Sequence, residues 1–162
     1  MNVVIGIDPG KSCGLTVFYD ARLAFIWQGS HERLRDVLTN QLHHAVRVIG
    51  TQTRSICIAV ERYVQLRGRH GRTPQNDALE VIGYVVALAA DWNVEASLQS
   101  PADARALAPD AVLRQLGVYA TGVDVNCPDA DDVNMATRHA LLHMAIKHNT
   151  MFARMISRAG QG

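Results

Sequence analysis

Residues 1–10 read Met-Asn-Val-Val-Ile-Gly-Ile-Asp-Pro-Gly. The apolar run from Val3 to Ile7 is followed directly by an acid, Asp8, and then by Pro9-Gly10. A short apolar run that ends at a Pro-Gly turn is typical of a buried central strand. Gly6 inside the run indicates that another backbone or a ligand comes close to it. In open α/β sheets, functional residues lie at the carboxyl ends of the strands, which is the position of Asp8. An Asp before Pro-Gly can instead have only the structural role of capping the turn. The other carboxylates of the chain decide between these two roles of Asp8.

The composition is that of an ordinary globular protein. The chain has 162 residues, 48% hydrophobic and 19% charged, which is enough for one core and too few for two. We predict a single domain over residues 1–162, with the tail after residue 150 as a helical extension or disordered. The longest nearly apolar stretch, 81–90, is too short for a membrane span, and the N-terminus has no signal-peptide pattern. We therefore expect a cytosolic protein without a membrane partner.

The three cysteines are Cys13, Cys57 and Cys127. They are odd in number and widely spaced, and two of them lie in apolar, strand-like patterns. This pattern favours reduced, buried thiols over a disulfide framework or a cysteine-based zinc site.

Alternating and continuous apolar runs predict strands at residues 3–7, 14–19, 23–28, 56–60 and 94–98. Apolar residues at helical spacing predict helices at 30–49, 76–92, 101–116 with an interruption at Pro109, and 128–148. The first three strands, joined by short links, indicate an antiparallel meander. The fourth strand is apolar throughout and ends at an acid, Glu61, so we expect it to lie parallel to the first. The predicted fold class is α/β, with a five-stranded mixed sheet flanked by helices.

The helix predicted at 76–92 is apolar nearly all round. Such a helix is buried on more than one side. One side would meet the sheet, and the other would meet either a second copy of the chain, in a homodimer, or the chain itself.

The formal net charge is only +1, but the cationic residues are unevenly distributed. Residues 62–76 contain no acid and carry Arg62, Arg67, Arg69 and Arg72. Residues 133–162 contain no acid and carry Arg138, Lys147, Arg154 and Arg158. Half of the 16 cationic residues therefore lie in two acid-free stretches, a pattern typical of phosphate binding and also of a solvated loop and tail.

The helix predicted at 128–148 opens with three acids, Asp129, Asp131 and Asp132. At about 3.6 residues per turn, Asp129 and Asp132 share one face of a helix and Asp131 points away. Capping the helix N-terminus needs one acid, so three indicate a further role.

Two strands that end in acids and a helix that begins with acids could place four carboxylates around one point. Such carboxylates repel one another unless cations lie between them. Hard oxygen ligands favour Mg²⁺, with Mn²⁺ as a substitute. Two such ions about 3.5–4 Å apart are the known arrangement for in-line attack on a phosphodiester.

Three motifs in this order resemble those of RuvC-type Holliday-junction resolvases, which have the RNase H-like fold. The motifs are Ile-Gly-Ile-Asp8-Pro-Gly, Ala-Val-Glu61 at a strand end, and Asp129-Ala-Asp-Asp132 before a helix. The resemblance runs over nearly the whole chain in element order and is strongest to the compact phage and actinobacterial versions.

The resemblance implies that Asp8, Glu61, Asp129 and Asp132 are the catalytic, metal-binding acids. It also implies a homodimer, in a bacterial or phage-infected cell, that nicks a four-way DNA junction symmetrically and leaves 5′-phosphate and 3′-hydroxyl ends. The predicted DNA-binding residues are Lys11, Arg62, Tyr63, Arg67, Arg69 and Arg72.

Two departures from the family pattern leave alternatives open. Related enzymes can carry His in place of the first helix acid, and here Asp131 is the alternative to Asp129. Family members place an aromatic residue near the glutamate to wedge into the junction. Tyr63 is one residue nearer to Glu61 than that pattern implies, so it is either this wedge or a packing residue.

His139 and His143 continue the helix face of Asp132. One of them could approach the scissile phosphate or orient a water, although a His on such a stripe is more often a packed residue. The spacing of His139, His143 and His148 also suggests a zinc helix, but the soft partners for zinc are missing from it.

Other function classes are less consistent with the sequence. A phosphate-binding loop that ends at Gly10-Lys11-Ser12 would need glycine at position 5, where the chain has Ile5. Actin-like ATPases share the opening motif but need a second half that 162 residues cannot supply. A DNA-junction binder without nuclease activity, and a nuclease that acts on flaps or replication forks, remain as alternatives. The sequence predicts neither the cleavage-site preference nor a helicase partner.

Overall fold

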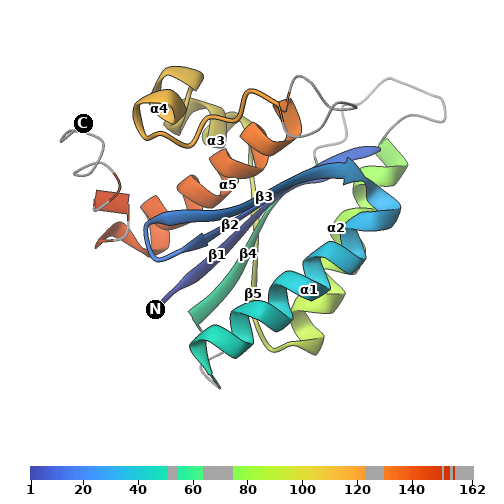
Figure 1. The fold of residues 1–162 in the computed structure, drawn as a ribbon. Coiled ribbons are helices and arrows are strands. Elements are labelled where there is room, and N and C mark those ends of the chain that lie inside the picture. Colours follow the sequence, from blue (N-terminus) through green and yellow to red (C-terminus); the bar gives the residue numbers. More distant parts are fainter. Residues whose placement is uncertain (51–54, 64–74, 123–129, 151, 154, 156–162) are drawn as a thin grey trace.

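The computed structural model describes all residues except 51–54, 64–74, 123–129, 151, 154 and 156–162. The apolar runs form the strands β1 (Val3–Asp8), β2 (Ser12–Tyr19), β3 (Arg22–Ser30), β4 (Ile56–Glu61) and β5 (Glu95–Gln99). They make one sheet in the order β3-β2-β1-β4-β5 (Figure 1). All five predicted strands are confirmed, and each boundary lies within two residues of the predicted one.

The sheet is mixed, as predicted. The pairs β1–β2 and β2–β3 are antiparallel, and the pairs β1–β4 and β4–β5 are parallel. The central strand β1 is covered on both faces, and Val3, Val4, Ile5 and Ile7 are fully buried. Burial on both faces explains why its sequence is a continuous apolar run rather than an alternating one.

Helices cover both faces of the sheet (Figure 1). One face carries α1 (His31–Ile49) and α2 (Gln75–Asp91), and the other carries α3 (Pro101–Leu107), α4 (Asp110–Gln115) and α5 (Asp131–Lys147). Two hydrophobic clusters result, one on each side of the sheet. Met155 near the C-terminus is buried in the second cluster and Phe152 packs against it, so these two side chains face the core.

Helix α5 is the most deeply buried helix among the described residues, and every residue from Val133 to Met144 is buried. It contacts β1, β2 and β4 on one side and α3 on the other. Its first residue is Asp131, so the predicted start at Pro128-Asp129 is wrong by about three residues. Ala130 precedes the helix in a left-handed conformation (φ 50°).

Arg138 corrects the interpretation of the acid-free C-terminal stretch. Its guanidinium is buried under α3 and α4, where Nε donates to the Ala108 carbonyl oxygen at 2.9 Å and a terminal nitrogen pairs with the Asp110 carboxylate. A buried cation is stable only when it is paired in this way. Arg138 therefore holds the α3–α4 corner on α5 and is not available to a phosphate.

Helix α2 is covered on one side only. Ala78, Val81, Val85 and Ala89 are buried against the sheet, whereas Leu79 and Val86 on the other side are 52% and 41% exposed. The expectation that its own chain covers both sides is therefore wrong. No helix in the described part of the chain is both long and apolar enough to cross a membrane.

Candidate active site

Two acids are brought together by the parallel pairing of β1 and β4. Ile7 and Val60 are register partners, and each is followed by the last residue of its strand, Asp8 and Glu61. Successive side chains of a strand alternate between faces, so both carboxylates point to the face that α5 covers. One oxygen of each carboxyl group lies within 4.8 Å of the other.

The third acid, Asp132, comes from α5, and two glycines allow this helix to approach the sheet closely. A methyl group on Gly14 would overlap the backbone carbonyl of Asp132, and one on Gly6 would overlap that of Ala136. Gly14 is the strand partner of Asp8. The glycine in the opening motif therefore marks a close approach of another backbone, as predicted, and that backbone belongs to α5.

The crowding of these acids changes the protonation of Asp8. Burial raises the pKa of Asp8 well above its usual value, and the negative charges of Glu61 and Asp132 raise it further. The charge of Arg105, an exposed residue of α3, partly opposes this shift. A strongly perturbed carboxyl group among other acids at the end of a buried strand is a frequent property of functional sites.

His139 lies beside this group and is fully buried. Its Nε2 atom is 3.4 Å from Glu61 Oε2, and its Nδ1 atom is 3.3 Å from the side-chain amide of Gln99, at the end of β5. With the amide nitrogen toward the helix, Gln99 donates to the His139 carbonyl oxygen at 2.9 Å and to Nδ1. In that arrangement the neutral imidazole carries its proton on Nε2 and donates it to Glu61.

The structure thus adds Gln99 and Arg105 to the candidate site. It also places His139, one of the two histidines that the sequence offers on the Asp132 face of the helix, beside Glu61. Gln99 and Arg105 carry no signal in the sequence, because an amide at a strand end and an arginine in a short helix are common everywhere.

The other predicted residues are distributed as follows. Lys11 and Arg62 are exposed and follow the strand ends that carry Asp8 and Glu61, and Tyr63 is half-buried. Asp131 is exposed as the first residue of α5.

Four predicted site residues lie outside the described residues: Asp129, Arg67, Arg69 and Arg72. Because α5 begins at Asp131, the helical spacing that paired Asp129 with Asp132 does not apply, and the role of Asp129 stays a prediction.

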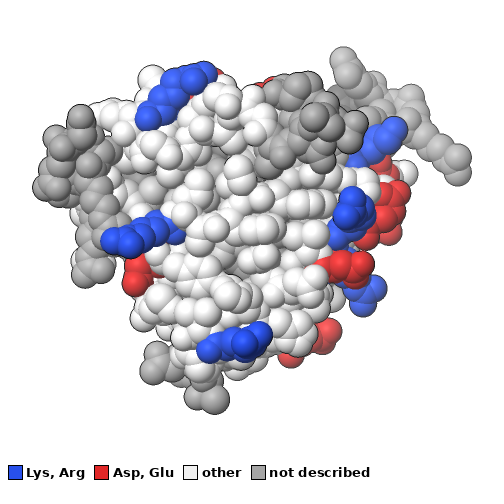
Figure 2. Space-filling view, viewed as in Figure 1, with Lys and Arg blue, Asp and Glu red and all other residues white. Residues whose placement is uncertain are grey.

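On the face seen in Figure 2, the Lys and Arg side chains stand apart from one another among uncharged residues. The described residues therefore form no continuous basic patch on this face.

The donor set fits a hard divalent cation. The ligand atoms of Asp8, Glu61 and His139 lie within 4.8 Å of one another, and the charge of Asp132 acts on Asp8. Carboxylate oxygens suit Mg²⁺ or Mn²⁺. Such a cation would neutralise the negative charges of Glu61 and Asp132, which contribute to the raised pKa of Asp8. Asp8, Glu61 and Asp132 are the residues that would hold it, with His139 as a neighbour of Glu61.

Comparison with solved structures identifies the fold. A structure of T. thermophilus RuvC in complex with Holliday junction substrate is 18% identical to this chain, with a TM-score of 0.63, and the match covers 96% of each chain. A second Thermus thermophilus RuvC structure is 20% identical, with a TM-score of 0.50, and the match covers 94% of this chain and 96% of that one. No family model and no curated protein match the sequence. The chain has the RuvC-type, RNase H-like fold, which confirms the resemblance at the level of structure.

Proposed function

We propose that this chain is a divalent-metal-dependent endonuclease that nicks four-way DNA junctions. The observation that carries the proposal is the convergence of Asp8, Glu61 and Asp132 from three separate elements, with a raised pKa at Asp8. A protein that only bound DNA would gain nothing from carboxylates gathered beside the phosphates. The fold shared with RuvC in complex with a Holliday junction supports the choice of substrate.

Asp8, Glu61, Asp129 and Asp132 would hold two Mg²⁺ ions, which Mn²⁺ could replace. When bound there, the ions supply a lowered pKa for the attacking water and a positive charge beside the scissile phosphate. The chain fixes the ligands: Asp8 and Glu61 by strand pairing, Asp132 by the contact of its backbone with Gly14. Attack of the water on phosphorus in line with a departing 3′-oxygen would break the P–O3′ bond and leave 5′-phosphate and 3′-hydroxyl ends.

Lys11 and Arg62 would contact the DNA backbone beside the acids, together with Arg67, Arg69 and Arg72 of the following segment. Arg105, whose charge reaches Asp8, is a further cation at this edge. Removal of any one of these cations should weaken binding to all DNA sequences alike and flatten the salt dependence. Tyr63 would lie at the junction centre in this proposal.

Symmetric nicking needs two active sites, and the uncovered side of α2 offers a surface for a second copy. Leu79 and Val86 on that side are large apolar residues exposed to solvent in the single chain. Exposed apolar residues that lie together on one helix face are frequent at protein–protein interfaces. The proposed active form is therefore a homodimer.

The decisive experiment compares the cleavage of three end-labelled substrates: a mobile four-way junction, a flap and a fork. Each is incubated with Mg²⁺ and, in parallel, with EDTA. The proposal expects Mg²⁺-dependent, paired nicks in opposite strands of the junction that a ligase can reseal. Preferential cleavage of the flap or fork would support the metal-dependent nuclease activity but would refute the four-way junction as its substrate. Junction binding under both conditions with no cleavage would refute the nuclease and favour a DNA-binding role.

A further inference from the structure

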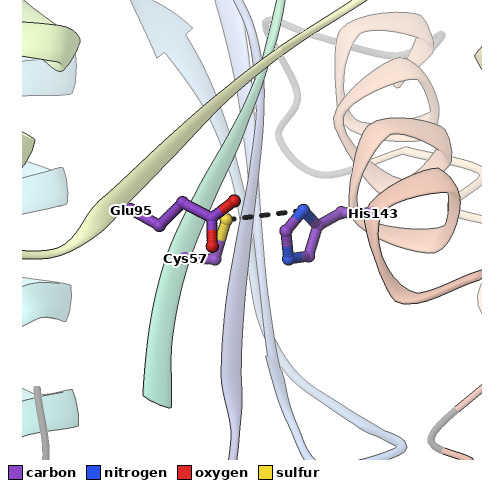
Figure 3. Close-up of side chains that lie close together, drawn as sticks. All are labelled: Cys57, Glu95 and His143. Atoms are coloured by element: carbon purple, nitrogen blue, oxygen red, sulfur yellow. Dashed lines mark hydrogen bonds between the residues drawn. The ribbon is translucent and has the colours of Figure 1, made fainter. Parts of the chain in front are cut away.

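A second group of side chains that could bind a metal lies between the sheet and α5, away from Asp8, Glu61 and Asp132. It consists of Cys57, Glu95 and His143, which point toward one another from β4, β5 and α5 (Figure 3). Cys57 and Glu95 are register partners on neighbouring strands, so their side chains share the face that α5 covers. Glu61 lies four residues further along β4, at the opposite end of that strand.

The geometry of this group suits a tetrahedral metal. The ligand atoms of all three residues lie within 4.8 Å of one another, and Cys57 Sγ is 3.5 Å from His143 Nδ1. A zinc ion with Zn–S of about 2.3 Å and Zn–N of about 2.0–2.1 Å holds its sulfur and nitrogen ligands roughly 3.5 Å apart. Cys57 and His143 are almost completely buried, whereas Glu95 is exposed and can adjust its carboxylate.

The protonation state of His143 suits a metal ligand, whereas the Cys57 thiol has to lose its proton to become one. Burial lowers the pKa of His143 to about 4, so its imidazole is neutral at neutral pH and can act as a ligand. Burial, aided by the charge of Glu95, raises the pKa of the Cys57 thiol above its usual value. The thiol therefore keeps its proton until a cation replaces it. His143 Nε2 is buried and has no hydrogen-bond partner among the described residues.

Two members of the group are next to solvent-accessible space. Glu95 is exposed, and His143 lines a pocket of about 240 Å³ together with Gln99, Arg62 and Lys147. A zinc ion with three protein ligands commonly takes a water molecule as its fourth ligand. The chemistry differs from that of the acids at the strand ends, since a thiolate and an imidazole select Zn²⁺ over Mg²⁺.

We propose that Cys57, Glu95 and His143 bind one Zn²⁺ ion, separately from the Mg²⁺ site of the proposed nuclease. The ion clamps α5 onto β4 and β5 one helical turn beyond His139. Binding releases the thiol proton to solvent as the sulfur–metal bond forms. The site differs from the zinc helix that the spacing of His139, His143 and His148 suggests, because the partners of His143 come from distant strands rather than from its own helix.

The test is a titration of the purified, metal-free protein with Co²⁺, an optical probe for Zn²⁺ sites, followed by competition with Zn²⁺. We expect thiolate-to-cobalt charge-transfer absorption that corresponds to one thiolate-bound Co²⁺ per chain and that Zn²⁺ abolishes. Zn²⁺ at about 100 times its Kd should also raise the Tm by roughly 5–10 °C. The absence of thiolate absorption in the wild-type protein would overturn the proposal, whatever its nuclease activity.

Matched variants locate the site. Cys57→Ala and His143→Gln should lose the absorption, while Cys13→Ala, at another buried free cysteine, and Asp8→Asn, in the proposed Mg²⁺ site, should keep it. Glu95→Gln changes an exposed residue and should weaken Co²⁺ binding at least 10-fold without affecting the fold, so it remains informative if a core variant unfolds. Absorption that survives in Cys57→Ala, or unchanged affinity in Glu95→Gln, would refute the assignment.

Discussion

The backbone of Asp132 lies against Gly14, the residue that pairs with Asp8 across the β1–β2 ladder. An acid on a helix and an acid on a strand are thus brought together by the absence of one side chain between them. The position of the helix acid relative to the strand acid is therefore determined by backbone contact, which is less adjustable than contact between flexible side chains.

We expect Gly14→Ala to lower cleavage more than its effect on stability explains. The added methyl group would overlap the Asp132 carbonyl, so the N-terminus of α5 has to move away from the sheet. Overpacking of this kind costs about 1–3 kcal/mol, which denaturant unfolding measures. Gly83→Ala in α2 is the control for stability only: nothing lies within 4 Å of the new methyl group, but Gly83 shares the uncovered side of α2 with Leu79 and Val86. It should raise stability by about 0.5–1 kcal/mol. Full cleavage activity in folded Gly14→Ala would contradict the positioning argument.

Asp8→Asn and Glu61→Gln should each abolish Mg²⁺-dependent cleavage of a four-way junction while junction binding survives. Both substitutions keep the shape of the side chain and remove the charge that a divalent cation needs. Gel-shift titration in Ca²⁺ or EDTA measures binding, and a labelled junction in Mg²⁺ measures cleavage. Cleavage at the wild-type rate in either variant would remove that residue from the metal site.

The metal-free protein should gain stability at neutral pH from Asp8→Asn. The pKa of Asp8 is raised in the folded state, so the folded protein binds more protons than the unfolded chain between the two pKa values. This contribution to the free energy of unfolding is complete below the pKa of Asp8 in the unfolded chain, about 3.9, and is lost as the pH rises through its pKa in the folded protein. Asn at position 8 cannot ionise, so the variant does not lose stability in this way. Thermal unfolding in EDTA from pH 4 to 8 tests this, with Asp36→Asn, an exposed acid of α1, as the control. A Tm difference that does not change with pH would show that Asp8 keeps an ordinary pKa.

The acids at the strand ends could be predicted from the sequence because their signal is local. An apolar run that ends in a carboxylate indicates both a buried strand and the place where it stops, as at Asp8 and Glu61. The parallel pairing of two such strands then brings their ends to the same edge. Helix positions along the chain were also predictable from apolar spacing, although the start of α5 was not, since the left-handed Ala130 gives no such signal.

The partners of buried polar residues were not predictable, because each depends on contacts between distant segments. Arg138 resembles a DNA-binding residue in sequence, and only Asp110, 28 residues away, reveals it as structural. His139 meets Glu61 across 78 residues, and Cys57 meets His143 across 86. No periodicity within one helix contains that information.

The exposed side of α2 should mediate dimerisation. We expect Leu79→Glu with Val86→Glu to yield a folded monomer in analytical ultracentrifugation at micromolar concentration, because two buried charges would face each other across a two-fold axis. The monomer should no longer make paired nicks. Val48→Glu, at an exposed apolar residue of α1, is the control and should leave the oligomeric state unchanged. A wild-type protein that is monomeric at the same concentration would remove the dimer from the proposal.

His139 should act by holding Glu61 in position rather than by contacting DNA. Its Nε2 atom faces Glu61 and its Nδ1 atom faces Gln99, so the ring is held between two strand ends. Removal of a group that orients a metal ligand typically costs about 10–100-fold in metal affinity or activity. His139→Ala should therefore need a higher Mg²⁺ concentration for half-maximal cleavage, with unchanged junction affinity in EDTA. His139→Gln, which can still donate to Glu61, should recover part of the loss. A purely packing role would lower the Tm of His139→Ala but leave its Mg²⁺ dependence at the wild-type value, and that result would refute the positioning role.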